Sequence, residues 1–197
     1  MVCAPEPGQR WWDVCAGGGG KTLLLAQLMC GKGIIVASDK YPFKLKELRK
    51  RTKRAGFSNI TIWNWKGKKL PEEKAIFDGV LVDAPCSGSG TWRRNPAARW
   101  NISKGDLKHF SSIQLDILTQ ASSGVKAGGI LIYATCSMFK EENEEVIKSF
   151  LSANPFFELD AFTNPFTGKY TPGYTYFWPW DADCDCMFVA RMKNIKT

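Results

Sequence analysis

The sequence predicts a single α/β domain of the Rossmann-like type, with a mostly parallel sheet and helices on both faces. Short apolar segments alternate with amphipathic ones, and a run of glycines follows the first apolar segment. Alternating strands and helices imply right-handed crossovers between parallel strands. No repeat, linker or low-complexity stretch divides the 197 residues, so we assign residues 1–197 to one domain.

Hydrophobic patterning places each element in turn. Compact apolar runs predict strands at residues 10–15, 33–38, 60–65, 77–82 and 129–135. Helical spacing predicts helices at about residues 22–29, 41–55, 105–125 and 140–153. The aromatic tail beyond Phe156 has turn signals at Pro165 and Gly173 and ends in an apolar segment at residues 187–192. This tail predicts an antiparallel hairpin at the C-terminus that lies at the edge of the sheet.

The bulk composition limits the function classes. A net charge of +8 and a pI of about 9.1 favour a polyanionic partner. The seven cysteines are scattered in a way that does not resemble a disulfide scaffold, which indicates a reducing compartment. With one histidine and no paired CxxC motifs, we expect no metal site. The apolar runs are too short to cross a bilayer and no signal peptide is recognisable, so we expect a cytoplasmic protein without membrane contact.

The segment DVCAGGGGKT, from Asp13 to Thr22, lies where the first strand turns into a helix. Glycine there allows the backbone to approach a ligand closely, and Asp39 ends the second strand where such folds bind ribose hydroxyls. The Walker spacing fails because Cys15 stands where a glycine is required, although Lys21 and Thr22 keep a nucleotide-hydrolysing protein as an alternative. A purely structural turn is a second alternative. The combination favours S-adenosylmethionine, which has no phosphate.

Two further strands end in cysteine-containing loops. One loop reads Asp83-Ala84-Pro85-Cys86, and the other contains Cys136 between Thr135 and Ser137. Ligands of a doubly wound sheet bind beyond the carboxyl ends of its strands. Neighbouring strands lie about 4.8 Å apart, so Cys86 and Cys136 would emerge side by side if their strands are adjacent. Each cysteine alone could equally be a small buried hydrophobe.

Two thiols beside a methyl donor suit methylation of carbon 5 of cytosine. Addition of a thiolate to C6 makes C5 nucleophilic enough to attack the sulfonium methyl group, which divides one difficult step into easier ones. The thiol must first lose its proton, because an unperturbed cysteine has a pKa of about 8.5. An acid at N3 assists the addition, so Asp83 must be protonated or act together with Lys21. These considerations alone do not say which cysteine attacks.

The sequence resembles the Sun family of RNA 5-methylcytosine methyltransferases in three places. DVCAGGGGKT resembles the cofactor motif, DAPCSGSGTWRRNP the catalytic loop, and TCS followed by Glu142-Asn143-Glu144 the nucleophile motif. Their order and spacing cover about residues 8–191. The resemblance, strongest to the bacterial small-subunit rRNA type, implies a methyltransferase fold with a seven-stranded sheet. It also implies an RNA substrate, ribosomal rather than transfer RNA, and a monomeric enzyme.

The resemblance also implies residue roles. Cys136 would attack C6 and Cys86 would assist product release, while Asp83 and Lys21 would contact the cytosine. The cofactor would be held by residues of the glycine segment and by three residues beyond it: Cys15, Ala16, Gly17, Gly18, Gly19, Gly20, Lys21, Asp39, Asn64 and Asp83.

This chain departs from the family pattern at several positions. Gly17-Gly18 replaces the usual Ala-Pro, and Asn64 lies where a carboxylate usually follows the third strand. Ala97 replaces a common acidic residue, and Cys186 replaces a glycine before the last strand. The family's N-terminal RNA-binding region is not among these residues, so we expect the 197 residues to be a catalytic core.

A basic and aromatic loop follows the first cysteine. Trp92, Arg93, Arg94 and Arg99, with Trp100, are candidates for RNA contacts, because arginines bind phosphates and indoles stack on exposed bases. Alternatively, the two tryptophans pack the loop onto the core. The basic helix at residues 41–55 is either a solvated face or an RNA track. A non-catalytic RNA-binding module remains the rival function.

Overall fold

The computed structural model describes residues 2–67, 70 and 75–196. Its elements follow one another in this order: β1 (Arg10–Asp13), α1 (Gly20–Leu28), β2 (Ile34–Asp39), α2 (Pro42–Ala55), β3 (Ile60–Asn64), β4 (Phe77–Asp83), the 3-10 turns η1 (Ser89–Thr91) and η2 (Pro96–Asn101), α3 (Lys104–Ser122), β5 (Val125–Thr135), η3 (Lys140–Glu142), α4 (Glu144–Ala153), β6 (Phe157–Leu159), β7 (Phe162–Thr163), β8 (Tyr170–Thr171), β9 (Tyr174–Phe177), α5 (Pro179–Ala182) and β10 (Met187–Asn194).

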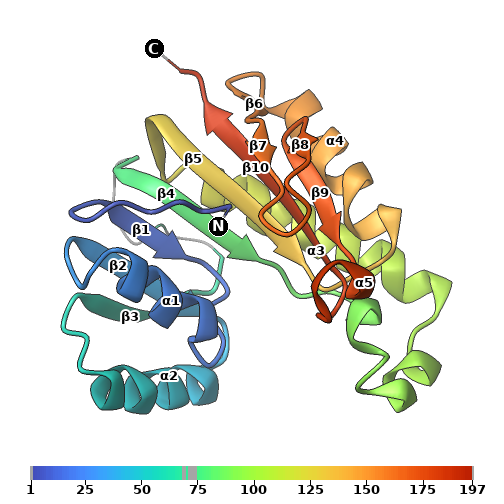
Figure 1. Cartoon of the computed structure of the whole chain (residues 1–197), viewed down its shortest axis with the longest axis horizontal. Helices are drawn as coiled ribbons and strands as arrows, with labels where there is room; N and C mark the ends of the chain where they lie inside the picture. The colour runs from blue at the N-terminus through green and yellow to red at the C-terminus, as the bar shows by residue number, and fades with distance from the viewer. Residues whose placement is uncertain (1, 68–69, 71–74, 197) are drawn as a thin grey trace.

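The main sheet confirms the predicted fold class. Seven strands run in the order β3-β2-β1-β4-β5-β10-β6, and the first five are mutually parallel (Figure 1). The strand order reverses between β1 and β4, which is where doubly wound sheets bind ligands. The expected C-terminal hairpin is formed by β9 and β10, which pair antiparallel. However, β10 lies inside the sheet between β5 and β6, and β9 adds an eighth strand beside it.

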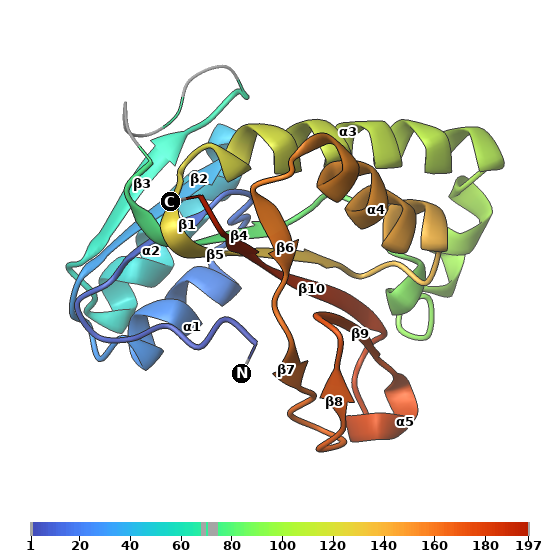
Figure 2. The same cartoon turned by 90° about the horizontal axis from the view of Figure 1, so that it is seen from above.

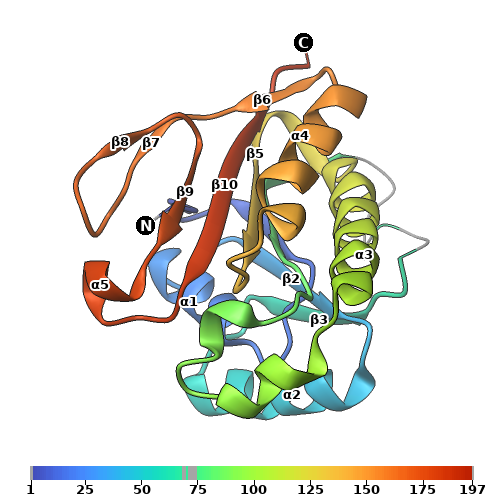
Figure 3. The same ribbon diagram turned by 90° about the vertical axis from the view of Figure 1, so that its right-hand side faces the viewer.

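Helices cover both faces of this sheet. Helices α1 and α2 lie on one face, and α3 and α4 pack together on the other (Figure 2). The small β7–β8 ribbon extends on the same side as α1 (Figures 2 and 3). Within the described residues, no helix combines the length and apolar character needed to cross a membrane.

The core has two sides because the central strands are buried on both faces. Trp11 and Trp12 are adjacent in β1, so their side chains point to opposite faces. Trp11 packs with Leu25 of α1, whereas Trp12 packs with Leu118 of α3. The Trp12 indole also donates a 2.8 Å hydrogen bond to Ser38 Oγ, which ties β1 to β2. This packing on both sides of β1 sets where β1, β2, β4 and β5 end.

The predicted helix at residues 140–153 is interrupted. Asn143 adopts φ −119° and ψ −96°, which separates the turn η3 from α4. Its side chain accepts a hydrogen bond from Thr135 Oγ1 and donates one to the carbonyl of Ser137. These bonds to the loop after β5 compensate for the break in the helix. The interruption therefore lies next to a predicted cysteine loop.

Candidate active site

The structure brings the two predicted cysteines together. Strands β4 and β5 are parallel neighbours, with Asp83 opposite Ala134 at their carboxyl ends. The loops that follow place Cys86 Sγ 3.3 Å from Cys136 Sγ. Both side chains are partly accessible. Two thiols in direct contact at the open end of the sheet form the chemical centre of the site.

The two thiols differ in acidity. The hydrogen bond between the two thiols lowers the pKa of Cys136, and the nearby Lys21 cation acts in the same direction, against burial and the Asp83 carboxylate. The same hydrogen bond, together with burial, raises the pKa of Cys86. Cys136 is therefore the thiol more readily ionised, and Cys86 retains its proton. Cys15, in the glycine loop, is different again, because burial raises its pKa.

A lysine and an aspartate form an ion pair beside the thiols. Lys21, in the first turn of α1, lies 2.7 Å from the carboxylate of Asp83 at the end of β4, and both side chains are partly exposed. Burial favours a lower pKa for Lys21, but the Asp83 charge and hydrogen bond outweigh it and raise the pKa. The ammonium group is therefore charged and directed to a carboxylate. A lysine held in this way does not favour the nucleotide-hydrolysing alternative, whose lysine binds phosphates.

A buried carboxylate joins the two cysteine loops. Glu142 is fully buried and accepts hydrogen bonds from Ser87 N (2.8 Å), Ser87 Oγ (2.5 Å), Ser137 Oγ (2.5 Å) and Gln114 Nε2 (2.9 Å). Ser87 follows Cys86, and Ser137 follows Cys136. One side chain thus fixes the residue after each thiol, so Glu142 is a positioning residue.

Backbone packing adds a second link between the same loops. The Gly90 N–H donates a 2.9 Å hydrogen bond to the carbonyl of Cys136, and the Gly90 carbonyl accepts one from the N–H of Cys186. A Cβ at position 90 would lie 2.2 Å from the Cys186 oxygen and 2.9 Å from the Cys136 oxygen. Only glycine therefore permits this approach.

The glycine loop is shaped by its own close contacts. Gly19 has φ +85°, and a Cβ there would lie 2.0 Å from Leu48 Cδ1 of α2. The carbonyl of Gly18 accepts a 2.8 Å hydrogen bond from Arg51 Nη1. Arg51 belongs to the predicted basic helix, yet it supports the loop. Gly20 then begins α1, whose first N–H groups have no intrahelical partners and can meet a ligand.

Two buried carboxylates end the neighbouring strands. Asp39 Oδ2 accepts from the Gly17 N–H at 3.0 Å, and Asp39 Oδ1 accepts from the Tyr41 N–H at 2.8 Å. Asp13 accepts from Thr22 Oγ1 at 2.6 Å, while its other oxygen has no hydrogen-bond partner among the described residues. Burial raises the pKa of Asp13 to about 7.

These groups fit an adenosine-type cofactor. Each carboxylate oxygen can accept two hydrogen bonds, so Asp39 retains capacity for ribose hydroxyls after binding Gly17 and Tyr41. Asn64 contributes differently, because its side-chain amide donates to the carbonyls of Asp39 and Lys40. It holds the turn after β2, and its side-chain oxygen remains as a possible acceptor.

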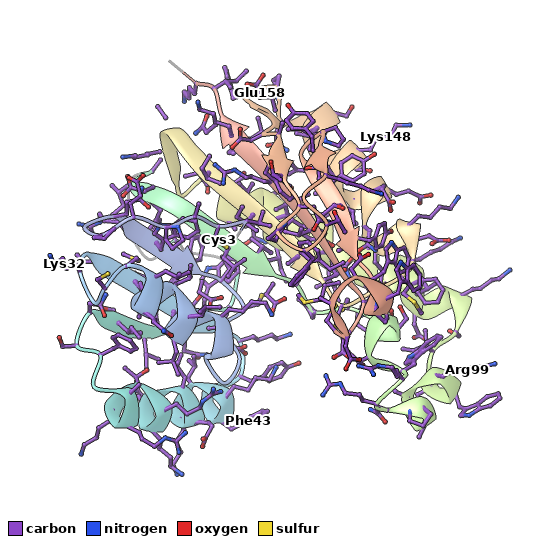
Figure 4. The ribbon with its side chains drawn as sticks, in the orientation of Figure 1. Cys3, Lys32, Phe43, Arg99, Lys148 and Glu158 are labelled. Carbon is purple, nitrogen blue, oxygen red and sulfur yellow. The ribbon has the colours of Figure 1, made fainter. Side chains whose placement is uncertain are left out.

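The arginine-rich loop is ordered by contacts with the C-terminal region. Trp92 is half-buried, with its ring edge-on to Phe139 at 6.0 Å, as the packing alternative expected. The same alternative is wrong for Trp100, which is 80% exposed. Arg93 pairs with Asp183, and Arg94 pairs with Asp185. Arg99 lies at the outer end of the η2 loop, against the exposed ring of Trp100 (Figure 4). Of these side chains, Arg99 and Trp100 are the most available to a ligand.

Two residues that support the site, Glu142 and Arg51, had no predicted role. The hydrophobic spacing of the sequence contains a partial signal for each of them. Glu142 precedes Val146 and Phe150 by four and eight residues, so helical spacing places it on the buried face despite its acidic neighbours. Arg51 likewise lies three residues after the buried Leu48. Which neighbours they contact depends on tertiary structure.

Comparisons with known proteins identify the family. A family model described as 16S rRNA methyltransferase RsmB/F matches residues 1–193. The ribosomal RNA small subunit methyltransferase F of Enterobacter sp. (strain 638) is 34% identical over 94% of this chain and 40% of its own length. The 28S rRNA (cytosine-C(5))-methyltransferase of Mus musculus is 33% identical over 98% of this chain and 26% of its own length. The chain thus spans less than half the length of these curated relatives.

Solved structures agree with this result. NSun6 from Pyrococcus horikoshii, solved with SFG, superposes with a TM-score of 0.85 at 27% identity, over 100% of this chain and 50% of that one. A methyltransferase homologue protein from Pyrococcus horikoshii gives a TM-score of 0.79 at 33% identity, over 98% and 63%. The resemblance to the Sun family drawn from the three motifs is confirmed. The chain belongs to the RsmB/F family of 16S rRNA methyltransferases.

Proposed function

We propose that this chain methylates carbon 5 of a cytosine in ribosomal RNA, using S-adenosylmethionine and a covalent bond between Cys136 and C6. The observation that carries the proposal is the contact between Cys86 and Cys136, 3.3 Å apart, next to the Lys21–Asp83 pair. The names of the relatives support the reaction and the ribosomal substrate. SFG, an analogue of S-adenosylmethionine, supports the cofactor.

In the proposed mechanism, the ionised Cys136 attacks C6 and the C5–C6 double bond opens. The enamine that forms between C4 and C5 makes C5 the nucleophile. Asp83 and Lys21 face the base: Lys21 supplies a proton to ring nitrogen N3 as negative charge develops there, and Asp83 holds the Lys21 ammonium group in position. Bound S-adenosylmethionine supplies the electrophilic methyl group. A base drawn from solvent then removes the C5 proton, which re-forms the C5–C6 double bond and expels Cys136 as a thiolate, and the proton on N3 returns to Lys21. The proton retained by Cys86 is available to that departing sulfur.

Residue positions suggest how the substrates enter. The glycine loop, Asp39 and Asn64 would hold the cofactor on the β1–β2 side, and the cytosine would approach from the side of the two cysteines. Because C5 is enclosed in a paired stem, the target cytosine must be unpaired or flipped out of its helix. We further propose that the chain acts as a monomer in the cytoplasm.

The direct test is methyl transfer from isotopically labelled S-adenosylmethionine to unmodified RNA of the small and large ribosomal subunits. We expect label in 5-methylcytosine, mapped by bisulfite sequencing. Calorimetry with the demethylated cofactor serves as the control that the cofactor site is functional. Cofactor binding without label in either RNA would contradict the proposed substrate, and label on another base would contradict the proposed reaction.

A further inference from the structure

An aromatic ladder leads from the cysteine loop to the surface. The rings of Tyr176 and Trp178 stack with centroids 4.9 Å apart and planes at 17°, and Trp178 stacks on Trp180 at 5.0 Å and 8°. These three residues span β9 and α5, the connection that precedes β10. Within the described residues, no aromatic ring covers the other side of Trp180, and 75% of this residue is exposed.

The ladder is held rigidly at both ends. Tyr176 Oη donates to Glu144 at 2.8 Å and accepts from Asn143 Nδ2 at 3.1 Å. The same Asn143 amide donates to the carbonyl of Ser137, the residue after Cys136. At the outer end, Pro179 begins α5 and Asp181 accepts from the Trp178 N–H, which fixes the turn that carries Trp180. An exposed indole in such a turn does not contribute to the core.

The surroundings of Trp180 suit a nucleobase better than a phosphate. Asp183 and Asp185, which follow α5, are paired with Arg93 and Arg94 of the catalytic loop, so the two arginines are locally neutralised. The exposed indole ring of Trp180 is flat and uncharged, and it extends a parallel stack of rings. It therefore matches the face of an unpaired base. The attraction for the RNA backbone comes instead from the overall charge of +8.

We propose that the outer face of Trp180 stacks an unpaired base of the substrate RNA that flanks the target cytosine. This inference rests on the proposed function, since it assumes an RNA substrate, and it adds a binding position outside the reacting centre. The position of a base stacked there would be fixed relative to Cys136 through Trp178, Tyr176 and Asn143. Stacking at Trp180 helps keep the target RNA strand unpaired beside the two thiols.

The test measures binding rather than methyl transfer, so that the two proposals can fail separately. A fluorescently labelled, unstructured single-stranded RNA and its duplex are titrated with the chain and with Trp180→Ala, Trp180→Phe and Phe156→Ala. Phe156 is an exposed aromatic at the opposite end of the sheet, beside β6, and serves as the matched control. We expect Trp180→Ala to weaken single-strand affinity about five- to hundredfold, while Trp180→Phe retains most of it and Phe156→Ala has no effect.

Salt titrations separate stacking from charge. Trp180→Ala should leave the slope of log affinity against log salt unchanged, whereas Arg99→Ala should make it shallower. Unchanged single-strand affinity in Trp180→Ala, an equal loss on duplex RNA, or no single-strand binding by the unmodified chain would each overturn the inference. So would unchanged RNA affinity together with altered self-association, since Trp180 would then be a protein contact. Stacking by a chain that transfers no methyl group would instead refute only the proposed function.

Discussion

The two halves of the catalytic edge are built in different ways. On the β4–β5 side, side chains cross-link the loops: Glu142 alone accepts four hydrogen bonds, two of them from Ser87. On the β1–β2 side, backbone N–H groups and glycines shape the loop, and the carboxylates of Asp13 and Asp39 keep unused acceptor capacity. The cysteine side fixes two thiols in contact, whereas the glycine side keeps hydrogen-bonding capacity that side chains do not use.

The electrostatics follow the same division. Beside the thiols, Cys86 and Lys21 together lower the pKa of Cys136 and prepare a nucleophile. Beneath the glycine loop, burial dominates and raises the pKa of both Asp13 and Cys15. The pKa of the thiol in the glycine loop is thus raised, whereas that of the thiol next to Cys86 and a cation is lowered. Local partners, rather than residue type, set the acidity of each cysteine.

The largest effect on stability is expected at Glu142. Glu142→Ala removes the acceptor that Ser87, Ser137 and Gln114 share, and it leaves the buried Ser87 N–H without one. The two serine hydroxyls keep a contact with each other, and Gln114 keeps its bond to the Pro85 carbonyl. Each buried hydrogen bond that is lost without replacement costs about 1–3 kcal/mol. We predict a loss of at least about 3 kcal/mol in the free energy of unfolding, measured by chemical denaturation. Glu142→Gln retains one acceptor oxygen and should cost less.

The matched control for this prediction is Glu158, which is an exposed glutamate on β6 at the far end of the sheet (Figure 4). Glu158→Ala should change stability by no more than about 0.5 kcal/mol. Equal effects at the two positions would show that the cysteine side is not held by the buried carboxylate.

The second prediction is a pH dependence of stability that originates at Asp13, on the glycine side of the site. Because burial raises the pKa of Asp13 from 3.8 to about 7, the folded state binds its proton more tightly than the unfolded state. The contribution of Asp13 to stability is therefore complete below pH 3.8 and is lost as pH rises to about 7. At about 1.36 kcal/mol per pKa unit, we expect the free energy of unfolding to fall by about 4 kcal/mol across this pH range. Asp13→Asn should remove this dependence, and parallel stability curves for both proteins would contradict the prediction.

A smaller effect is expected on ligand affinity at Asp39. If its spare acceptor sites bind ribose hydroxyls, Asp39→Ala should weaken binding of the demethylated cofactor by about 1.5–3 kcal/mol, or roughly ten- to hundredfold. Calorimetry measures this directly. Asp116→Ala, on the exposed side of α3, should leave the affinity unchanged. An unaltered affinity in Asp39→Ala would remove this residue from the cofactor site.

Much of the fold could be predicted because its strands are compact apolar runs bounded by turns. The first five strands lie within a few residues of their predicted positions, and the register of β4 and β5 follows from their parallel pairing. The placement of β10 inside the sheet could not be predicted, because its apolar residues suit an edge and an interior strand equally. The helix break at Asn143 was also missed, since it depends on hydrogen bonds to Thr135 and Ser137.

The site residues that lie at strand ends could be predicted from the sequence. Contacts between segments that are distant in the sequence could not. Cys86, Cys136, Asp83 and Lys21 converge as expected, because β4 and β5 end and α1 begins at the same edge of the sheet. The ion pairs of Arg93 and Arg94 with the C-terminal loop span about ninety positions, so no local pattern reveals them. For the same reason, the aromatic ladder that ends at Trp180 was not anticipated.

The central claim is that Cys136 attacks and Cys86 acts on its sulfur. It is tested most directly by trapping the RNA adduct with S-adenosylmethionine and a validated substrate RNA, followed by denaturing electrophoresis. We predict that Cys136→Ala forms neither adduct nor product, and that Cys86→Ala accumulates RNA joined to Cys136. Because Cys86 lowers the pKa of Cys136, adduct formation in Cys86→Ala should also require a higher pH. Cys30→Ala, at an exposed cysteine in the turn after α1, is the control and should behave like the unmodified chain. An adduct in Cys136→Ala and none in Cys86→Ala would reverse the roles, and full activity in both would reject covalent catalysis.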